Sequence, residues 1–169
     1  MKLVNFEIKR IYAGWFYVEF KGEDKQIMIT ASDVWDNDSP KYFLKMITEC
    51  LIEKQFNKYV VFDEEPGTYI VSIEKNETVI LTVCYSKIEG FEWNDLELHG
   101  DLSLEQIKSY IPIEKELIKI EIDLGYLAKT IYRSFEEYRF GTNRKEYEEN
   151  WMKYPEAEFK QLSKLLKIK

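Results

Sequence analysis

Apolar and polar residues alternate with a period of two in two separate blocks of the chain. This period is typical of strands that bury one face of a sheet. The first block predicts three strands, over residues 4–9, 15–20 and 26–30. The second block predicts three more, over residues 58–62, 69–73 and 79–85. The turns between them are short, which predicts antiparallel pairing within each block.

An amphipathic helix is predicted between the two blocks. Apolar residues recur there at intervals of three and four, at Phe43, Met46, Ile47, Cys50 and Leu51. Ser39 is the expected N-cap, and Pro40 suits the first turn because its missing N–H has no partner there. The helix is expected to end near Gln55.

The last half of the chain begins with an irregular acidic stretch, residues 87–112. Phe91 and Trp93 are interpreted as a short strand, and Ser103 with Gln106 fits the capping box of a brief helix. A strand is predicted over residues 117–123, followed by a helix that Asp123 caps and Gly141 interrupts. Two further helices are predicted over residues 144–153 and 156–166.

The predicted element order is βββ-α-βββ-β-α-α, and runs of strands separated by few helices favour an α+β fold. We expect one domain over residues 1–169. It should contain a mostly antiparallel sheet of six to eight strands, with both blocks in a shared layer and the helices packed on one face.

The chain is acidic, with 31 Asp and Glu against 24 Lys and Arg in 169 residues and a formal net charge of −7. Nucleic-acid binding is not expected, because phosphate recognition needs a basic surface. The N-terminus lacks the apolar region of a signal peptide, and no stretch is long enough for a membrane span. A cytoplasmic protein without membrane contact is therefore expected.

Catalytic signatures are scarce. His99 is the single histidine, and Cys50 and Cys84 lie on apolar faces of predicted elements. The chain has no glycine-rich phosphate loop and no GxSxG nucleophile elbow. We therefore predict no catalytic residue, no metal ligand and no cofactor.

Two acidic clusters allow a different interpretation. Asp33, Asp36 and Asp38 precede the first helix, and Asp63-Glu64-Glu65 precede Pro66-Gly67. The first cluster has the oxygen ligands that a hard cation prefers, and paired carboxylates can act as acid and base. Turn formation and favourable contact with a helix N-terminus explain the same residues without any function.

A third acidic stretch is the predicted protein-binding site. Carboxylates and aromatic side chains are interleaved there, and aromatic anchors within a charged rim are typical of interface hot spots. The candidate binding residues are Glu89, Glu92, Trp93, Asp95 and Glu97. A half-exposed strand would give the same pattern.

Several segments together resemble a family of small, uncharacterised bacterial proteins similar in style to the immunity proteins encoded beside polymorphic toxins. The resemblance lies in Gly14-Trp15-Phe16, Ala31 to Pro40, Asp63 to Tyr69 and Tyr147 to Pro155. These are turn and core residues, so no catalytic residue is implied. The resemblance implies a small acidic cytosolic binding protein.

The leading hypothesis is a non-enzymatic acidic module that binds a basic protein, such as a toxin domain. One alternative is a carboxylate- or metal-dependent hydrolase that uses the first two acidic clusters. Another is a structural subunit that forms a homodimer through a sheet edge, so that both a monomer and a homodimer remain open.

Overall fold

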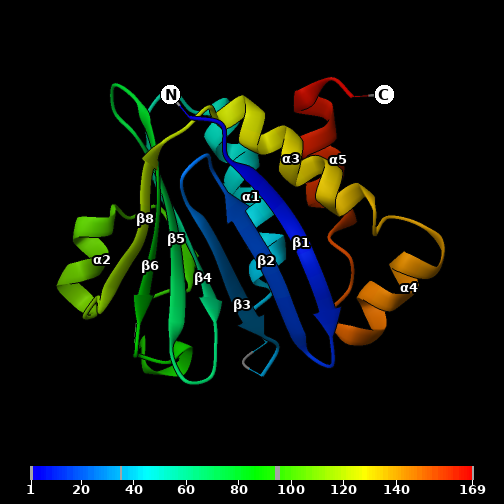
Figure 1. Ribbon diagram of the computed structural model, residues 1–169, viewed down its shortest axis with the longest axis horizontal. Helices are drawn as coiled ribbons and strands as arrows, with labels where there is room; N and C mark the ends of the chain where they lie inside the picture. The colour runs from blue at the N-terminus through cyan, green and yellow to red at the C-terminus, as the bar shows by residue number, and fades with distance from the viewer. Residues whose placement is uncertain (1, 35, 94–95, 169) are drawn as a thin grey trace.

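The computed structural model describes residues 2–34, 36–93 and 96–168. These residues form eight strands and five α-helices, and all strand pairs in the two sheets are antiparallel (Figure 1). The α+β class and the antiparallel pairing predicted from the sequence are confirmed. None of the helices described is long and apolar enough to cross a membrane.

The first block forms a small sheet of three strands, β1 (Asn5–Tyr12), β2 (Trp15–Lys21) and β3 (Gln26–Ser32). The β1–β2 turn uses Ala13 and Gly14, both with positive φ. Gly14 is required for a second reason. A Cβ at this position would lie 2.6 Å from Asp33 Oδ1.

The second block contributes to a separate, larger sheet. Its strands are β4 (Phe56–Asp63), β5 (Thr68–Lys75), β6 (Val79–Ser86), β7 (His99–Gly100) and β8 (Lys115–Glu121). The spatial order is β7-β4-β5-β6-β8. The two blocks of strands therefore form two sheets rather than the one shared layer that was expected. In the described residues, a single isolated bridge, Lys2 to Ile122, joins the first segment of the chain to the end of β8.

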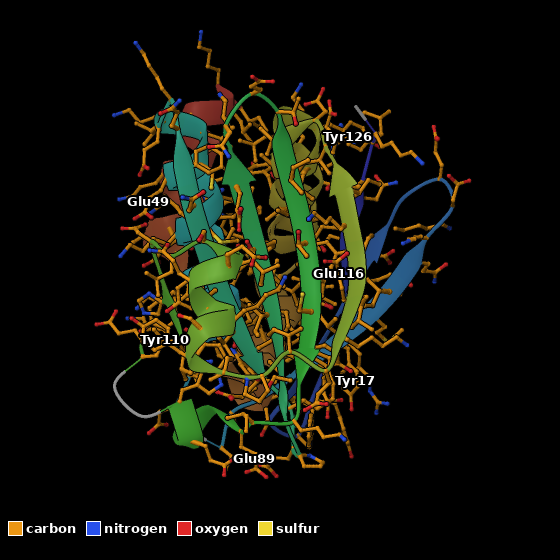
Figure 2. The ribbon with its side chains drawn as sticks, turned by 90° about the vertical axis from the view of Figure 1, so that its left-hand side faces the viewer. Tyr17, Glu49, Glu89, Tyr110, Glu116 and Tyr126 are labelled. Atoms are coloured by element: carbon orange, nitrogen blue, oxygen red, sulfur yellow. The ribbon has the colours of Figure 1, made fainter. Side chains whose placement is uncertain are left out.

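Four helices surround the small sheet and the adjacent face of the large one: α1 (Ser39–Ile52), α3 (Leu124–Glu136), α4 (Gly141–Asn150) and α5 (Glu156–Leu166). Figure 2 shows α2 (Leu104–Tyr110) in front of the large sheet, on its other face. The expected packing of helices on one face thus applies to α1 and α3, while α2 covers a second core against Tyr59, Val61, Ile70 and Cys84.

The main core is built around Phe43 of α1. Its ring centroid lies 5.2 Å from Phe6 of β1 and 5.9 Å from both Phe20 of β2 and Phe62 of β4. One fully buried side chain therefore contacts both sheets. Aromatic pairs at such distances are stabilised beyond the area that they bury.

Local signals identified two N-caps and the bounds of α5 (Glu156–Leu166) correctly, but α1 ends at Ile52 rather than near Gln55. The helix that Asp123 caps ends at Glu136, and Gly141 begins α4 (Gly141–Asn150), which was predicted over residues 144–153. Asp123 caps α3 by accepting from the Tyr126 N–H, and Ser103 with Gln106 forms the predicted capping box of α2. The cap of α1 differs by one residue, because Asp38 rather than Ser39 accepts the Lys41 N–H. Phe91 and Trp93 do not form the predicted strand and lie instead in a 3-10 turn, η1 (Gly90–Trp93).

The outer edge of β1 is covered by hydroxyl groups of α3. The Phe6 N–H donates to Thr130 Oγ1 at 3.0 Å, and the Ile8 N–H donates to Ser134 Oγ at 2.7 Å. Unpaired N–H groups at a sheet edge can form hydrogen bonds with a strand of another chain. These two side chains therefore close an edge that would otherwise be open.

Thr130→Val should lower the free energy of unfolding by about 1–3 kcal/mol, because it leaves the buried Phe6 N–H without an acceptor while keeping the side-chain shape. Urea unfolding at neutral pH measures the change. Thr142→Val on exposed α4 is the matched control and should lie within about 0.5 kcal/mol of wild type. Equal effects of the two substitutions would refute a structural role for the Thr130 hydroxyl.

Candidate functional site

Three acidic segments that are distant in the sequence meet at one end of the molecule. The strands β3, β4 and β6 run in the same direction, so the segments that follow them lie together (lower end of Figure 1). We define the acidic end by the carboxylates of Asp33, Asp36, Glu64, Glu65, Glu89 and Glu92. All six are at least partly exposed.

Hydrogen bonds tie the three segments to one another. Thr30 Oγ1 donates to Glu64 Oε1 at 2.6 Å, which links β3 to the segment after β4. Asn37 Nδ2 donates to Asp63 Oδ2 at 3.1 Å and to the Val61 carbonyl at 2.9 Å. Thr68 Oγ1 donates to the Ile88 carbonyl at 3.0 Å, which holds the segment after β6.

Asp63 lies beneath the acidic end with only 1% of its surface exposed. Its Oδ1 has no hydrogen bond of good geometry among the described residues, and it lies against the backbone of Gly90. A Cβ at Gly90 would lie 2.0 Å from this oxygen. Glycine is therefore required here by the close approach of a carboxylate.

Burial raises the pKa of the Asp63 carboxyl to about 6. The Asn37 side chain and the Gly90 backbone oppose this rise, while the charges of Glu89 and Glu65 add to it. A pKa in this range suits acid-base chemistry. The side chain is nevertheless too buried to reach a substrate, so its protonation acts on the loops that it holds together.

The residues of the predicted binding stretch do not form one patch. Glu89 and Glu92 belong to the acidic end, where the Glu89 N–H donates to Glu92 Oε2 at 3.0 Å. Glu97 is exposed at a different place, beside β7, and Asp95 lies outside the described residues.

Trp93 is a core residue. It is 3% exposed and stacks on Tyr59 with ring centroids 6.4 Å apart, in the core between α2 and the large sheet. The expectation that Trp93 is an exposed aromatic anchor of a binding site is therefore wrong. Leu96 and Leu98 from the same stretch also pack against this core.

The aspartates before α1 have separate roles. Asp38 caps α1 and accepts from Trp151 Nε1 at 3.2 Å, while Asp33 packs against Gly14 of the β1–β2 turn. Asp36 is exposed with φ of 53°. Across residues 2–34, 36–93 and 96–168, no three His, Cys, Asp or Glu side chains are grouped so that they could hold a metal ion.

A second polar feature lies at the opposite edge of the large sheet from β8, around Lys58 of β4. The Lys58 ammonium contacts three carboxylates, Glu49 at 3.1 Å, Glu53 at 2.9 Å and Asp101 at 2.6 Å. Burial opposes its charge, but the hydrogen bonds that the ammonium donates to Asp101, Glu53 and Glu49 outweigh burial and raise the pKa of Lys58. The ammonium group therefore holds together α1, β4 and the segment after β7.

His99 lies next to this network, in β7. Its imidazole stacks on the Tyr42 ring at a centroid distance of 3.7 Å. Burial lowers the pKa of His99, so the ring is neutral at pH 7. The alternating pattern of β4 gave no sign of this feature, because Lys58 occupies a position that the sequence presents as an ordinary polar strand residue.

Asp63→Asn should change the pH dependence of stability. The folded-state pKa of about 6 exceeds the usual ~3.9, so the folded state binds this proton more tightly than the unfolded state does. Wild type should therefore lose about 2–3 kcal/mol relative to Asp63→Asn as the pH rises from about 4 to above 6. Urea unfolding across this range measures the difference.

Glu77→Gln, in the exposed β5–β6 turn, controls for the loss of one negative charge. It should leave the pH profile of wild type unchanged. A constant difference between Asp63→Asn and wild type at every pH would show that burial does not perturb Asp63.

Lys58→Met should destabilise the protein by about 1–2 kcal/mol, because three carboxylates lose their shared counter-ion. The loss is smaller than for a fully buried pair, since the Glu49, Glu53 and Asp101 side chains are 36%, 42% and 77% exposed. Lys45→Met is the control, because exposed Lys45 lies 3.9 Å from Glu49 and such pairs contribute little. Thermal unfolding of both variants tests the expectation, which fails if Lys45→Met is the more damaging change.

Comparison with known proteins assigns no role to any of these features. No protein-family model matches the chain, and neither a curated protein nor a solved structure matches it.

Proposed function

We propose that the protein is a non-enzymatic binding module whose acidic end docks onto a basic surface of a partner protein. One observation carries the proposal. Six carboxylates from three chain segments converge there, and in the described part of the chain none of them takes part in an ion pair.

The contrast with other surfaces supports this interpretation. On α4 and α5, Glu148 lies 2.7 Å and Glu156 3.0 Å from the guanidinium of Arg144. At the β7 edge, the Lys58 ammonium likewise pairs with three carboxylates. On these two surfaces carboxylates have cationic partners, whereas among the described residues no ion pair reaches the six carboxylates of the acidic end.

Unpaired carboxylates at one end produce a local negative potential. Such a field accelerates the approach of a basic partner and makes association sensitive to salt. The net charge of −7 acts in the same direction. The Asn37–Asp63 and Thr30–Glu64 hydrogen bonds tie together the segments that carry these side chains.

Neutralisation of a basic toxin domain is the specific form of this proposal that the family resemblance implies. An acidic module of this kind would act by covering the basic active site of such a domain. This role requires no catalytic group of its own, which agrees with the buried position of Asp63.

The triple variant Glu65→Lys, Glu89→Lys, Glu92→Lys tests the proposal. Partner proteins are sought by co-expression with the products of the genes adjacent to its own, and association is then measured by stopped flow at several salt concentrations. We expect the variant to associate at least about tenfold more slowly at low salt, because electrostatic steering is reversed. The salt dependence should also become weaker or change sign.

The control variant carries the same change of net charge elsewhere, with Glu77→Lys, Glu137→Lys and Glu149→Lys on exposed positions. Its association rate should stay much closer to that of wild type. Recovery of no stoichiometric protein partner, or equal behaviour of the two triple variants, would contradict the proposal.

A further inference from the structure

A small cleft lies at the β7 edge of the large sheet, apart from the acidic end. It has a volume of about 180 Å³, well above the ~10–15 Å³ that one water molecule needs. Residues of α1, β4 and the β7 segment line it, and Figure 2 shows Glu49 on the α1 side, away from Glu116 of β8. Lys45, Glu97 and Asp101 of its lining are exposed, so a small group can enter the cleft from solvent.

The charge of the cleft is negative. Glu49, Glu97 and Asp101 line it together with Lys45 and Lys58, and Glu53 contacts Lys58 from beside it. Four carboxylates thus face two ammonium groups. The Lys58 contact uses Oδ1 of Asp101 and leaves the other oxygen available, and the Glu97 carboxylate has no ion pair among the described residues.

Two stacked aromatic rings form part of the remaining wall, beside Met46, Val60 and Gly100. The stacked rings of Tyr42 and His99 both line the cleft, with an angle of 21° between their planes. The Lys41 ammonium lies 5.9 Å from the centroid of one of them, Tyr42. Because burial keeps the imidazole neutral at pH 7, the ring does not repel a cation. The phenol of Tyr59, also in the lining, donates to the Glu97 carbonyl and fixes the entrance segment.

We propose that this cleft binds a guanidinium group. A guanidinium is planar, weakly hydrated and always charged, so it can stack on an aromatic wall while its N–H groups donate to carboxylates. Asp101 and Glu97 supply the acceptors, and the imidazole of His99, which stacks on Tyr42, supplies the flat surface. Lys58 positions Asp101 and Glu49 rather than contacting the ligand, because its own donors are directed at three carboxylates.

The single histidine makes the test direct, since its imidazole gives one set of ¹H–¹³C resonances in the NMR spectrum. Guanidinium chloride is titrated well below denaturing concentrations, with sodium chloride at equal ionic strength as the reference. We expect saturable shifts of the His99 resonances. Methylammonium, which is compact and strongly hydrated, should bind at least about tenfold more weakly.

Asp101→Asn should weaken guanidinium binding about tenfold, because a charge-assisted hydrogen bond is replaced by a neutral one. Asp101 is largely exposed, so the substitution leaves folding intact. Tyr42→Leu removes the ring on which His99 stacks and should also weaken binding. Glu23→Gln, in the exposed β2–β3 turn on the far side of the molecule, should bind as wild type does.

Absence of a saturable His99 shift would overturn the proposal, as would equal binding of methylammonium and guanidinium or equal affinities of Asp101→Asn and Glu23→Gln. Two further ligands then distinguish whether the guanidinium belongs to a small molecule or to a protein side chain. Tighter binding of agmatine identifies a small molecule, and tighter binding of a blocked arginine tripeptide identifies a side chain of a protein.

Discussion

The packing of Phe43 between the two sheets is the contact on which the other features depend. Its ring touches Phe6, Phe20 and Phe62, which belong to three strands of two separate sheets. This contact fixes the position of α1. The N-terminus of α1 then lies at the acidic end, where Asn37 reaches Asp63, and its last turns carry Glu49 toward Lys58.

The carboxylates of this protein have three different surroundings. Asp63 is buried without a cation, and burial raises its pKa to about 6. Glu49, Glu53 and Asp101 share one buried ammonium group, whereas the six carboxylates of the acidic end have no counter-ion among the described residues. Asp63 stabilises loops, and the carboxylates around Lys58 join α1, β4 and the segment after β7. The carboxylates of the acidic end, and the oxygens beside Lys58 that do not contact its ammonium, are left to bind ligands.

Several features followed from local sequence alone. The capping side chains of Asp123 and Ser103 were identified correctly because a cap needs only residues within one turn of the helix. The strands were identified from their period of two. Trp93 was misjudged because alternation shows that one face is buried without showing which neighbour covers it, and here α2 supplies the cover.

By itself, the sequence determined the α+β class, the antiparallel pairing of neighbouring strands and the acidic character of the chain, because these depend on short-range period and composition. Only the tertiary structure decided that the strands divide into two sheets, that β7 pairs with β4, and that Lys58 meets carboxylates from α1 and from beyond β7. These contacts join residues up to 43 positions apart in the Lys58 network and up to 126 at the edge of β1. Local patterns carry no information about such pairings, which arise from how whole elements pack.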